Sequence, residues 1–246
     1  MENAPIINIG ARKVQAEYFE RWNNWQMSYY DWLVKHPNVR QINRYHITKE
    51  NPQYNNIITV TLYDSLSDFE KARNSPEAKA YYEDQDTAWA SRTKLIWYAQ
   101  YQLIKSFRGG SAVSEVQVKE SVVENAPIMH LEGYGFSFDE QGQYNTWVTK
   151  WGHEVYIPWL TKLPGLKEYA RYQFFDAWSP YAKVPRAPAQ YPPYLSILHF
   201  EDIHSYENYE KSMELAAFRE AMKLPFPQDL EFKWYVQYQL MRSWRK

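Results

Sequence analysis

The chain has 246 residues, of which 45% are hydrophobic and 23% charged, so its composition is that of a folded globular protein. Its 28 Lys and Arg nearly balance its 29 Asp and Glu, and this net charge of −1 argues against a nucleic-acid partner. There is no cysteine, which excludes disulfides, thiolate nucleophiles and cysteine-ligated metals. No signal peptide and no apolar run of about 18 residues is recognisable, so we expect a cytoplasmic protein without a membrane partner.

The chain contains two copies of one sequence pattern. Residues 2–6 (ENAPI) recur at 124–128, and residues 97–107 align with 234–244. Between these ends the order of matching segments is preserved, which makes chance a poor explanation. We therefore predict two repeats joined by a linker, with a proline-rich loop inserted into the second repeat. Their bounds are 1–107 for the first repeat, 108–123 for the linker, 124–246 for the second repeat and 177–193 for the loop.

The first repeat alternates strand and helix patterns. From residue 17 to 35, aromatic residues recur at intervals of three and four, which predicts an amphipathic helix. The aromatic face of this helix consists of Tyr18, Trp22, Trp25, Tyr29 and Trp32. The expected elements are a strand at 4–14, a helix at 17–35, strands at 39–47 and 57–63, a helix at 66–89 capped by Ser65 or Ser67, and a strand at 95–107.

The second repeat has the same order of patterns. The expected elements are a strand at 126–138, a helix after Asp139 that continues to Trp159, strands at 166–175 and 195–200, a helix at 205–222, and a strand at 232–244. The order strand, helix, strand, strand, helix, strand is that of the ferredoxin-like fold. We therefore predict an α+β protein in which two ferredoxin-like (βαββαβ) repeats form a pseudo-dimeric α/β barrel, with a homodimer of the fused pair as a further assembly.

Residues 147–172 also carry a family pattern. A helix with two tryptophans and a histidine precedes a Leu-Pro-Gly turn and an Arg-Tyr pair on the next strand. The residues are Trp147, Trp151, His153, Glu154, Leu163, Pro164, Gly165, Arg171 and Tyr172. This segment resembles EthD-type proteins of the dimeric α/β barrel superfamily. The resemblance implies a small-molecule enzyme, because members include cofactor-free monooxygenases, polyketide cyclases and dehydratases, and more distantly haem proteins of the chlorite dismutase type.

His153 is the first candidate catalytic residue, since an imidazole exchanges protons near neutral pH and the resemblance supports this position. The first repeat has Gln26 or Met27 there, so we expect the site in the second repeat. Helical geometry offers an alternative, because His153 lies about 200° around the helix from Trp151, a direction that can face solvent.

Two further histidines fall where the first repeat has none. His130 alternates with Glu132 on a predicted strand, at the position of Asn8, and His199 replaces Leu62. If their face turns into the barrel, His130 and Glu132 form an acid/base couple; the alternative is a hydrogen-bonded core histidine. This difference between the repeats is the strongest internal indication of a single site.

Arg171 is the candidate charge stabiliser, although Arg44 at the matching position also suits a structural role in both repeats. Aromatic residues make up 18% of the chain and either fill its core or line a pocket for a flat ligand. The predicted substrate-binding residues are Trp147, Trp151, Tyr172, Trp234 and Glu132.

Metal-binding and nucleotide-binding motifs are absent from the sequence: HExxH, GxGxxG and GxxxxGK[ST] do not occur. We expect no metal and no cofactor, with a haem as the alternative. The function predicted is acid/base chemistry, that is cyclisation, dehydration, isomerisation or cofactor-free oxygenation, on a hydrophobic, aromatic or polyketide-like molecule. The alternatives are a non-catalytic small-molecule binding protein and a haem protein of the chlorite dismutase type.

Overall fold

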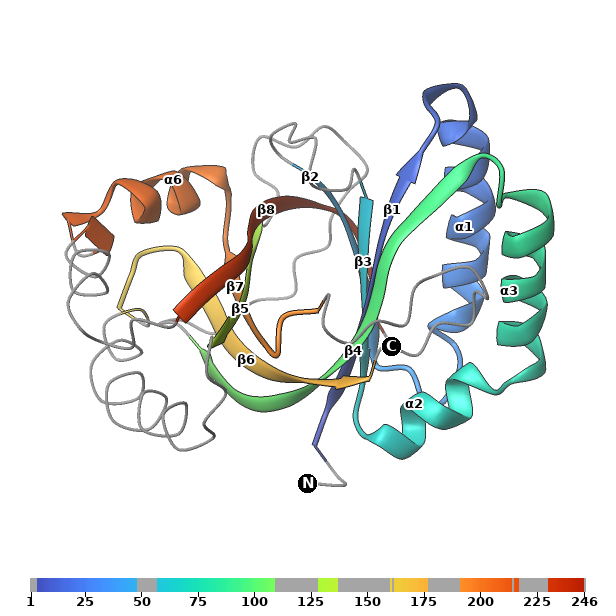
Figure 1. Ribbon diagram of the computed structural model, residues 1–246, viewed down its shortest axis with the longest axis horizontal. Helices are drawn as coiled ribbons and strands as arrows, with labels where there is room; N and C mark the ends of the chain where they lie inside the picture. The colour runs from blue at the N-terminus through green and yellow to red at the C-terminus, as the bar shows by residue number, and fades with distance from the viewer. Residues whose placement is uncertain are drawn as a thin grey trace. The chain divides into compact units, whose positions relative to one another are not determined.

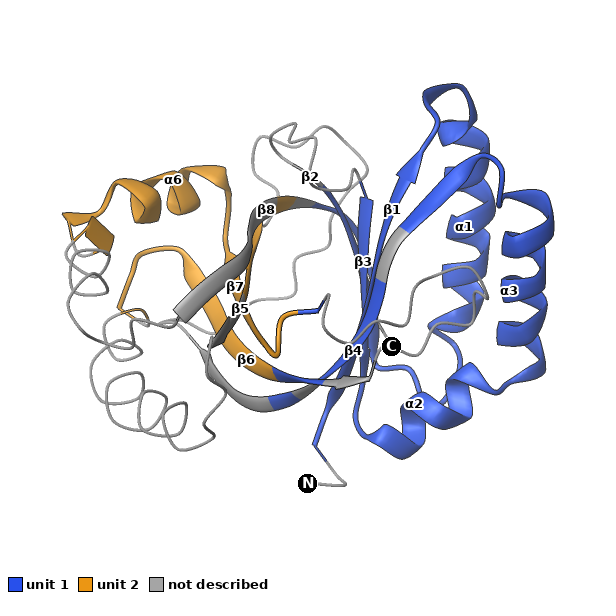
Figure 2. Cartoon of the chain, viewed as in Figure 1, with its two compact units in different colours: residues 1–103, 173–191, 240–246 blue, residues 104–172, 192–239 orange. Residues whose placement is uncertain are grey.

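The computed structural model describes residues 4–47, 57–108, 128–136, 160, 162–176, 191–213, 215–216 and 230–245. The chain divides into two compact units (Figure 2). Unit 1 comprises residues 1–103, 173–191 and 240–246, and unit 2 comprises residues 104–172 and 192–239. The predicted linker beyond Arg108 and the predicted loop before Tyr191 lie outside the described residues, and the predicted repeat boundaries stay predictions.

The described elements follow the predicted order closely (Figure 1). They are β1 (Ile6–Val14), η1 (Ala16–Tyr18), α1 (Phe19–Leu33), β2 (Gln41–Ile47), β3 (Ile57–Tyr63), α2 (Leu66–Arg73), α3 (Pro76–Ala88), β4 (Thr93–Arg108), β5 (Ile128–Phe136), β6 (Leu166–Asp176), β7 (Tyr194–Phe200), α6 (Ile203–Lys211) and β8 (Leu230–Arg245). Each predicted strand is present, with ends displaced by a residue or two. The predicted helix before Trp159 lies outside the described residues.

The sheet has the strand order β1-β3-β2-β8-β5-β7-β6-β4, in which β4 returns to β1 and closes a barrel. β1 pairs antiparallel with β3 and β4, and β3 with β2. In unit 2, β5 likewise pairs antiparallel with β7 and β8. The fold is therefore α+β with an antiparallel barrel, as the sequence predicts at this level.

The central strands β1 and β5 have the same register with their neighbours. Ile6 of β1 lies opposite Tyr63 of β3, and Ile128 of β5 lies opposite Phe200 of β7. The register also shifts once where β1 pairs with β4 and once where β5 pairs with β8. The shift follows Ala11 in β1 and Gly133 in β5, the same position in the two copies of the sequence.

The predicted helix at 66–89 is two helices, α2 and α3. Ser75 caps α3, its Oγ accepting a hydrogen bond from the Ala78 amide at 3.2 Å, and Pro76 occupies the first turn. Proline lacks the amide needed to continue a preceding helix and suits the first turn of a new one, so the break is encoded locally. Of the two predicted caps, Ser65 is the one used, since its Oγ accepts from the Asp68 amide.

The buried face of α1 is rotated from the predicted aromatic stripe. Its buried residues are Trp22, Gln26, Tyr30 and Leu33. The prediction shares only Trp22 with this set. Trp25 and Tyr29 are half-buried instead, and they stack on Tyr81 of α3, the helix that lies along the flank of α1 (Figure 1). Tyr81 of α3 stacks on Tyr29 with ring centroids 3.6 Å apart, and its hydroxyl accepts a hydrogen bond from Gln26 at 3.0 Å.

Each unit packs helices on one face of its strands around an apolar cluster. In unit 1 the cluster consists of Ile6, Tyr30, Leu33, Val39, Ile42, Tyr63, Phe69 and Ala72. In unit 2 it consists of Ile128, Leu160, Leu166, Tyr169, Leu198, Phe200, Tyr206, Tyr209 and Leu215. Ile6 and Ile128, which match in the sequence, lie at equivalent places in the two clusters. The side chains two and four residues after each of them point to the same face of the strand and therefore also lie beneath the helices.

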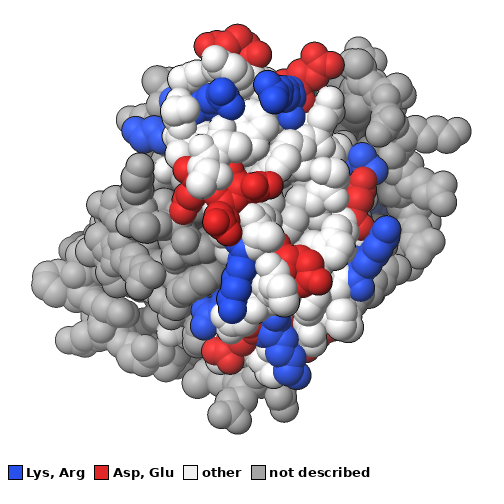
Figure 3. Space-filling view, turned by 90° about the vertical axis from the view of Figure 1, so that its right-hand side faces the viewer, with Lys and Arg blue, Asp and Glu red and all other residues white. Residues whose placement is uncertain are grey.

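Among the described residues, no helix is both long and apolar enough to cross a membrane. Figure 3 shows the side of the molecule that carries α1 and α3. Positive and negative side chains are interspersed there, so the described part of this face has no extended patch of one sign.

Candidate functional site

The helix-covered face of unit 2 holds a group of buried polar side chains. Three strands contribute them: β5 supplies His130 and Glu132, β6 supplies Tyr169 and Arg171, and β7 supplies Ser196. A sheet face beneath a helix is normally apolar, because buried polar groups must find partners to offset the loss of water. Such a concentration of titratable groups therefore marks this face as the candidate site.

His130 and Glu132 form the predicted pair. Their Nε2 and Oε1 atoms are 3.1 Å apart, and the side chains are 0% and 10% exposed. They follow Ile128 by two and four residues on the same strand, so their side chains lie on the same face as Ile128, the face covered by α6. The His130 ring packs against Tyr206 and Tyr209 of α6, with centroids 5.4 and 6.2 Å away.

Arg171 joins the same face through Tyr169. Its Nε donates a hydrogen bond to the Tyr169 hydroxyl at 2.7 Å, and that hydroxyl is 3.1 Å from Ser196 Oγ. Ser196 lies opposite Glu132 in the pairing of β5 with β7. Burial raises the pKa of Tyr169, the Arg171 charge lowers it and the Glu132 charge raises it. Tyr169 is therefore neutral at physiological pH and feels the charges of both neighbours.

This arrangement supplies the parts of an acid/base centre. A carboxylate accepts a proton, an imidazole beside it holds or passes one, and a buried guanidinium favours negative charge nearby. Water is largely excluded from the group, which strengthens each electrostatic interaction.

Two of the other predicted residues, His199 and Tyr172, lie away from this group. His199 alternates with Ser196 and Leu198 and so lies on the opposite face of β7, where its Nδ1 is 3.6 Å from Glu168 Oε2. Tyr172 follows Arg171 and likewise lies on the opposite face of β6. The backbone of Trp234 is opposite Gly133 in the sheet. His153, Trp147 and Trp151 lie outside the described residues.

Tyr169 and Ser196 were not predicted from the sequence, although a difference between the two repeats pointed to Tyr169. The first repeat has Ile42 and Thr59 at the matching positions. An exchange of isoleucine for tyrosine at a buried strand position is the same kind of difference that singled out the histidines.

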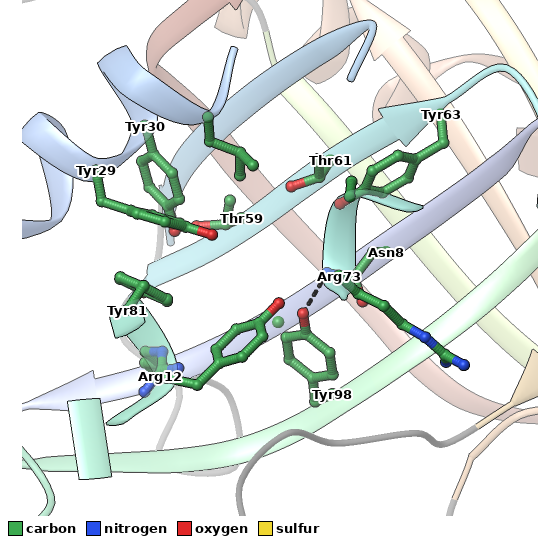
Figure 4. A pocket seen from close by; sticks show the side chains of 14 residues that line it. Asn8, Arg12, Tyr29, Tyr30, Thr59, Thr61, Tyr63, Arg73, Tyr81 and Tyr98 are labelled. Atoms are coloured by element: carbon green, nitrogen blue, oxygen red, sulfur yellow. Dashed lines mark hydrogen bonds between the residues drawn. The ribbon is translucent and has the colours of Figure 1, made fainter. Parts of the chain in front are cut away.

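Unit 1 has a hollow between its sheet and helices (Figure 4). Its water-accessible space is about 40 Å³. Tyr29 and Tyr30 of α1 lie at one end of the view, and Tyr63 and Arg73 at the other. The remaining lining residues are Asn8, Gly10, Arg12, Leu33, Thr59, Thr61, Ala72, Tyr81, Tyr82 and Tyr98.

Hydrogen bonds fix several side chains of this hollow. Asn8 Nδ2 donates to the Tyr98 hydroxyl at 2.6 Å (Figure 4), and Asn8 Oδ1 accepts from Gln100 Nε2 at 2.8 Å. The Tyr30 hydroxyl donates to Thr59 Oγ1 at 3.2 Å. Burial raises the pKa of Tyr98 to about 12, and it also raises the pKa of Tyr30, so both hydroxyls stay protonated at neutral pH.

Two observations on the described residues bear on a metal ion and on a haem at His130. They contain no group of three or more His, Cys, Asp or Glu side chains able to hold a metal ion. A haem would need a histidine nitrogen facing open space for the ring. His130 does not fit, because its Nε2 contacts Glu132 and Tyr206 lies 5.4 Å from its ring centroid.

No family model matches the chain, and no curated protein matches its sequence. Solved structures do match. One is a protein from Fusobacterium nucleatum subsp. nucleatum ATCC 25586 named "Putative monooxygenase", with TM-score 0.64 and 9% identity over 100% of this chain and 96% of that one. An anthrone oxidase-like protein has TM-score 0.61 and 9% identity over 100% and 94%.

A mutant chlorite dismutase from Candidatus Nitrospira defluvii, solved in complex with cyanide, has TM-score 0.59 and 8% identity over 98% of this chain and 92% of that chain. These similarities extend over almost the whole length of both partners. They agree with the predicted dimeric α/β barrel superfamily at the level of the fold.

Proposed function

We propose that the protein is a small-molecule enzyme of the EthD-like dimeric α/β barrel type, built from two fused ferredoxin-like repeats. The shared register of β1 and β5, with the same irregularity at matching positions, supports the duplication. The names of the structural neighbours, which include monooxygenase, anthrone oxidase-like and chlorite dismutase, support an enzyme. A cytoplasmic location and a homodimer of the fused pair stay predictions.

The observation that carries this proposal is the buried contact between His130 and Glu132, with Arg171 on the same face of the sheet. The proposed reactions are those that begin with loss of a proton from carbon: cyclisation, dehydration, isomerisation or cofactor-free oxygenation. The proposed substrate is hydrophobic, aromatic or polyketide-like, since such molecules give a stabilised carbanion.

Glu132 is the proposed base. Its side chain is 10% exposed, whereas that of His130 is fully buried, so the carboxylate is the member of the pair that a substrate can reach. His130 orients the carboxylate through the 3.1 Å contact and holds the positive charge when it is protonated. Arg171 and the neutral Tyr169 favour the anion formed on the substrate.

His153, Trp147 and Trp151 complete the proposed site through the family resemblance, as wall and second acid. His199, Tyr172 and Trp234 were predicted with them, but the faces of His199 and Tyr172 oppose that of Glu132. We therefore propose the His130, Glu132 and Arg171 group as the centre of the chemistry.

Anthrone is a suitable probe substrate. Removal of a proton from its methylene carbon gives an aromatic enolate, which reacts with O₂ to give anthraquinone and water. We expect the wild-type protein to accelerate this conversion, followed by absorbance. Glu132→Gln and His130→Gln should each lower the rate by about 100-fold or more, whereas His204→Gln, at an exposed site on α6, should leave it unchanged.

Two alternatives predict other outcomes. A non-catalytic binding protein is favoured by the full burial of His130, and would retain aromatic ligands without turnover of anthrone or related aromatic ketones. A haem protein of the chlorite dismutase type would show a Soret band after purification. Unchanged rates in the Glu132→Gln and His130→Gln variants would refute the proposed centre.

A further inference from the structure

Arg44 of β2 is a buried cation in unit 1. Its side chain is 0% exposed, and its Nε, Nη1 and Nη2 atoms all lack a hydrogen-bond partner. The guanidinium lies 4.7 Å from the centre of the Trp22 ring, a cation–π contact that satisfies none of its donors. Arg171 occupies the matching position in unit 2 and donates to Tyr169, but the residue that corresponds to Tyr169 in unit 1 is Ile42.

Within the part of the chain that the structure describes, no carboxylate compensates this charge. The ionisable groups that act on Arg44 are the phenols of Tyr30 and Tyr81 and a second cation, Arg12. Burial lowers the pKa of Arg44, yet an arginine remains protonated under ordinary conditions. A buried charge without a partner is strongly unfavourable, which makes an external anion the natural complement.

The same three groups connect Arg44 with the hollow. Tyr30, Tyr81 and Arg12 all line it (Figure 4), as does Thr59, which lies opposite Arg44 in the pairing of β2 with β3. Arg44 itself is not one of the lining residues. An anion in this hollow would therefore lie against the Arg12 guanidinium and the hydroxyl groups of Tyr30, Tyr81 and Thr59, and next to the buried charge of Arg44.

The size of the hollow limits the ligand. About 40 Å³ of water-accessible space corresponds to roughly three water molecules, well below the roughly 150 Å³ that holds a benzene ring. A carboxylate group is planar, carries one charge and matches the donor geometry of a guanidinium. We propose that the hollow of unit 1 binds a small carboxylate, with Arg12 in its wall and Arg44 as the adjacent buried charge that the anion offsets.

This site lies in the other unit from the proposed acid/base centre, so it goes beyond the proposed function and is tested without an activity assay. The test is a titration of the full chain with ¹³C-labelled acetate, followed by NMR, together with thermal unfolding at each concentration. Acetamide, with the same shape and no charge, is the control ligand. Benzoate distinguishes a free small carboxylate from the carboxylate of a larger aromatic ligand.

We expect saturable acetate binding that raises the unfolding midpoint, and no comparable effect of acetamide. Arg44→Met should weaken acetate binding at least about tenfold and should not lower the unfolding midpoint without ligand, because it removes an uncompensated charge. Arg171→Met should keep acetate binding but lower the midpoint, since Arg171 has a hydrogen-bond partner.

Arg44→Lys keeps the positive charge but lacks the planar guanidinium group. It replaces Arg44→Met in the test if the methionine variant does not fold. It should bind acetate less tightly than wild type but more tightly than it binds acetamide. Tighter binding of benzoate than of acetate, lost in the Arg44 variants, would assign the site to the carboxylate of an aromatic ligand. Equal responses to acetate and acetamide, or full acetate affinity in Arg44→Met, would overturn the proposal.

Discussion

The two units share a strand register but differ in the side chains beneath their helices. Unit 2 has titratable residues where unit 1 has an amide, a glycine or an apolar group. The equivalent positions pair Asn8 with His130, Gly10 with Glu132, Ile42 with Tyr169, Arg44 with Arg171 and Thr59 with Ser196. Only the arginine is common to both, and it has a hydrogen-bonded partner in unit 2. The two units therefore share one buried charge, which has different surroundings in each.

Gly10 shows why unit 1 does not hold a copy of the acid/base pair. A Cβ atom at Gly10 would lie 3.0 Å from Cδ2 of Tyr98, so this ring fills the space that a glutamate would need. Tyr98 is held there by the hydrogen bond from Asn8, the residue that replaces histidine. The two differences from unit 2 are thus coupled through one tyrosine.

The largest predicted effect on stability is at Gly165 of unit 2. Its φ of 78° lies in the left-handed region, and an added Cβ would overlap Ser205 at the start of α6. We expect Gly165→Ala to lower the free energy of unfolding by about 2–4 kcal/mol, since backbone strain and overpacking add. Urea unfolding measures this loss.

Gly10→Ala is the matched change in unit 1. It has no unfavourable φ, and the Tyr98 ring can shift, so we expect a smaller loss of about 1–2 kcal/mol. A loss at Gly10 equal to or larger than that at Gly165 would show that the unit 1 hollow is packed more rigidly than its geometry indicates.

The next largest effect is a loss of folding stability at alkaline pH, to which Tyr98 contributes. The pKa of Tyr98 is about 12 in the folded protein and near 10 when unfolded, chiefly because of burial. Between these values the folded state binds more protons, so stability falls as pH rises above about 10. Tyr98→Phe should cost about 1 kcal/mol at pH 9, where it removes the bond from Asn8, and less at pH 11.

The measurement is urea unfolding of Tyr98→Phe and wild type at pH 9 and pH 11. Other buried tyrosines, including Tyr30, add to the decline in both proteins, so the comparison uses the difference between them. A difference that stays constant or grows from pH 9 to pH 11 would contradict the assignment of Tyr98 as a buried neutral phenol that accepts from Asn8.

The smallest predicted losses of stability are those from removing either of two N-terminal helix caps at matching positions of the two units. Ser65 caps α2 of unit 1, and Asp202 caps α6 of unit 2 through a 2.7 Å bond from the Ser205 amide to Oδ1. Burial acts to raise the pKa of Asp202, but hydrogen bonds from Ser205 and His204 outweigh it and the pKa is lowered. Ser65→Ala and Asp202→Ala should each cost about 1 kcal/mol at pH 7.

The two caps should differ in acid. A lowered folded pKa stabilises the protein above the unfolded pKa near 4, and this contribution is lost as pH falls through the folded value. The cost of Asp202→Ala should therefore shrink at pH 3, and by more than that of Ser65→Ala, because the Ser65 cap accepts through an uncharged hydroxyl and only its second bond, to Asp68 Oδ2, involves a carboxylate. Equal changes for the two variants between pH 7 and pH 3 would argue against a charged cap.

Alternating and periodic patterns were enough to predict the strands and their order, because each strand buries its side chains in a regular way. The break between α2 and α3 was equally present in the sequence as Ser75 followed by Pro76. The buried face of α1 could not be predicted from α1 alone, since the position of α3 decides that Gln26 is covered.

The pair of His130 and Glu132 was predictable because strand alternation places residues two apart on one face. Its partners Tyr169 and Ser196 depend on register across three strands, which no local pattern specifies. The missing hydrogen-bond acceptor for Arg44 was harder still to predict from the sequence, because it depends on the side chains of every element that packs around the guanidinium.

We propose that unit 2 differs from unit 1 because its buried polar pair performs chemistry. The most direct test gives unit 2 the residues of unit 1, in the double variant His130→Asn/Glu132→Gly, and measures anthrone turnover and the free energy of unfolding together. We predict that turnover falls by about 100-fold or more while the protein stays folded with a cooperative transition. Full turnover in the folded double variant would contradict the account.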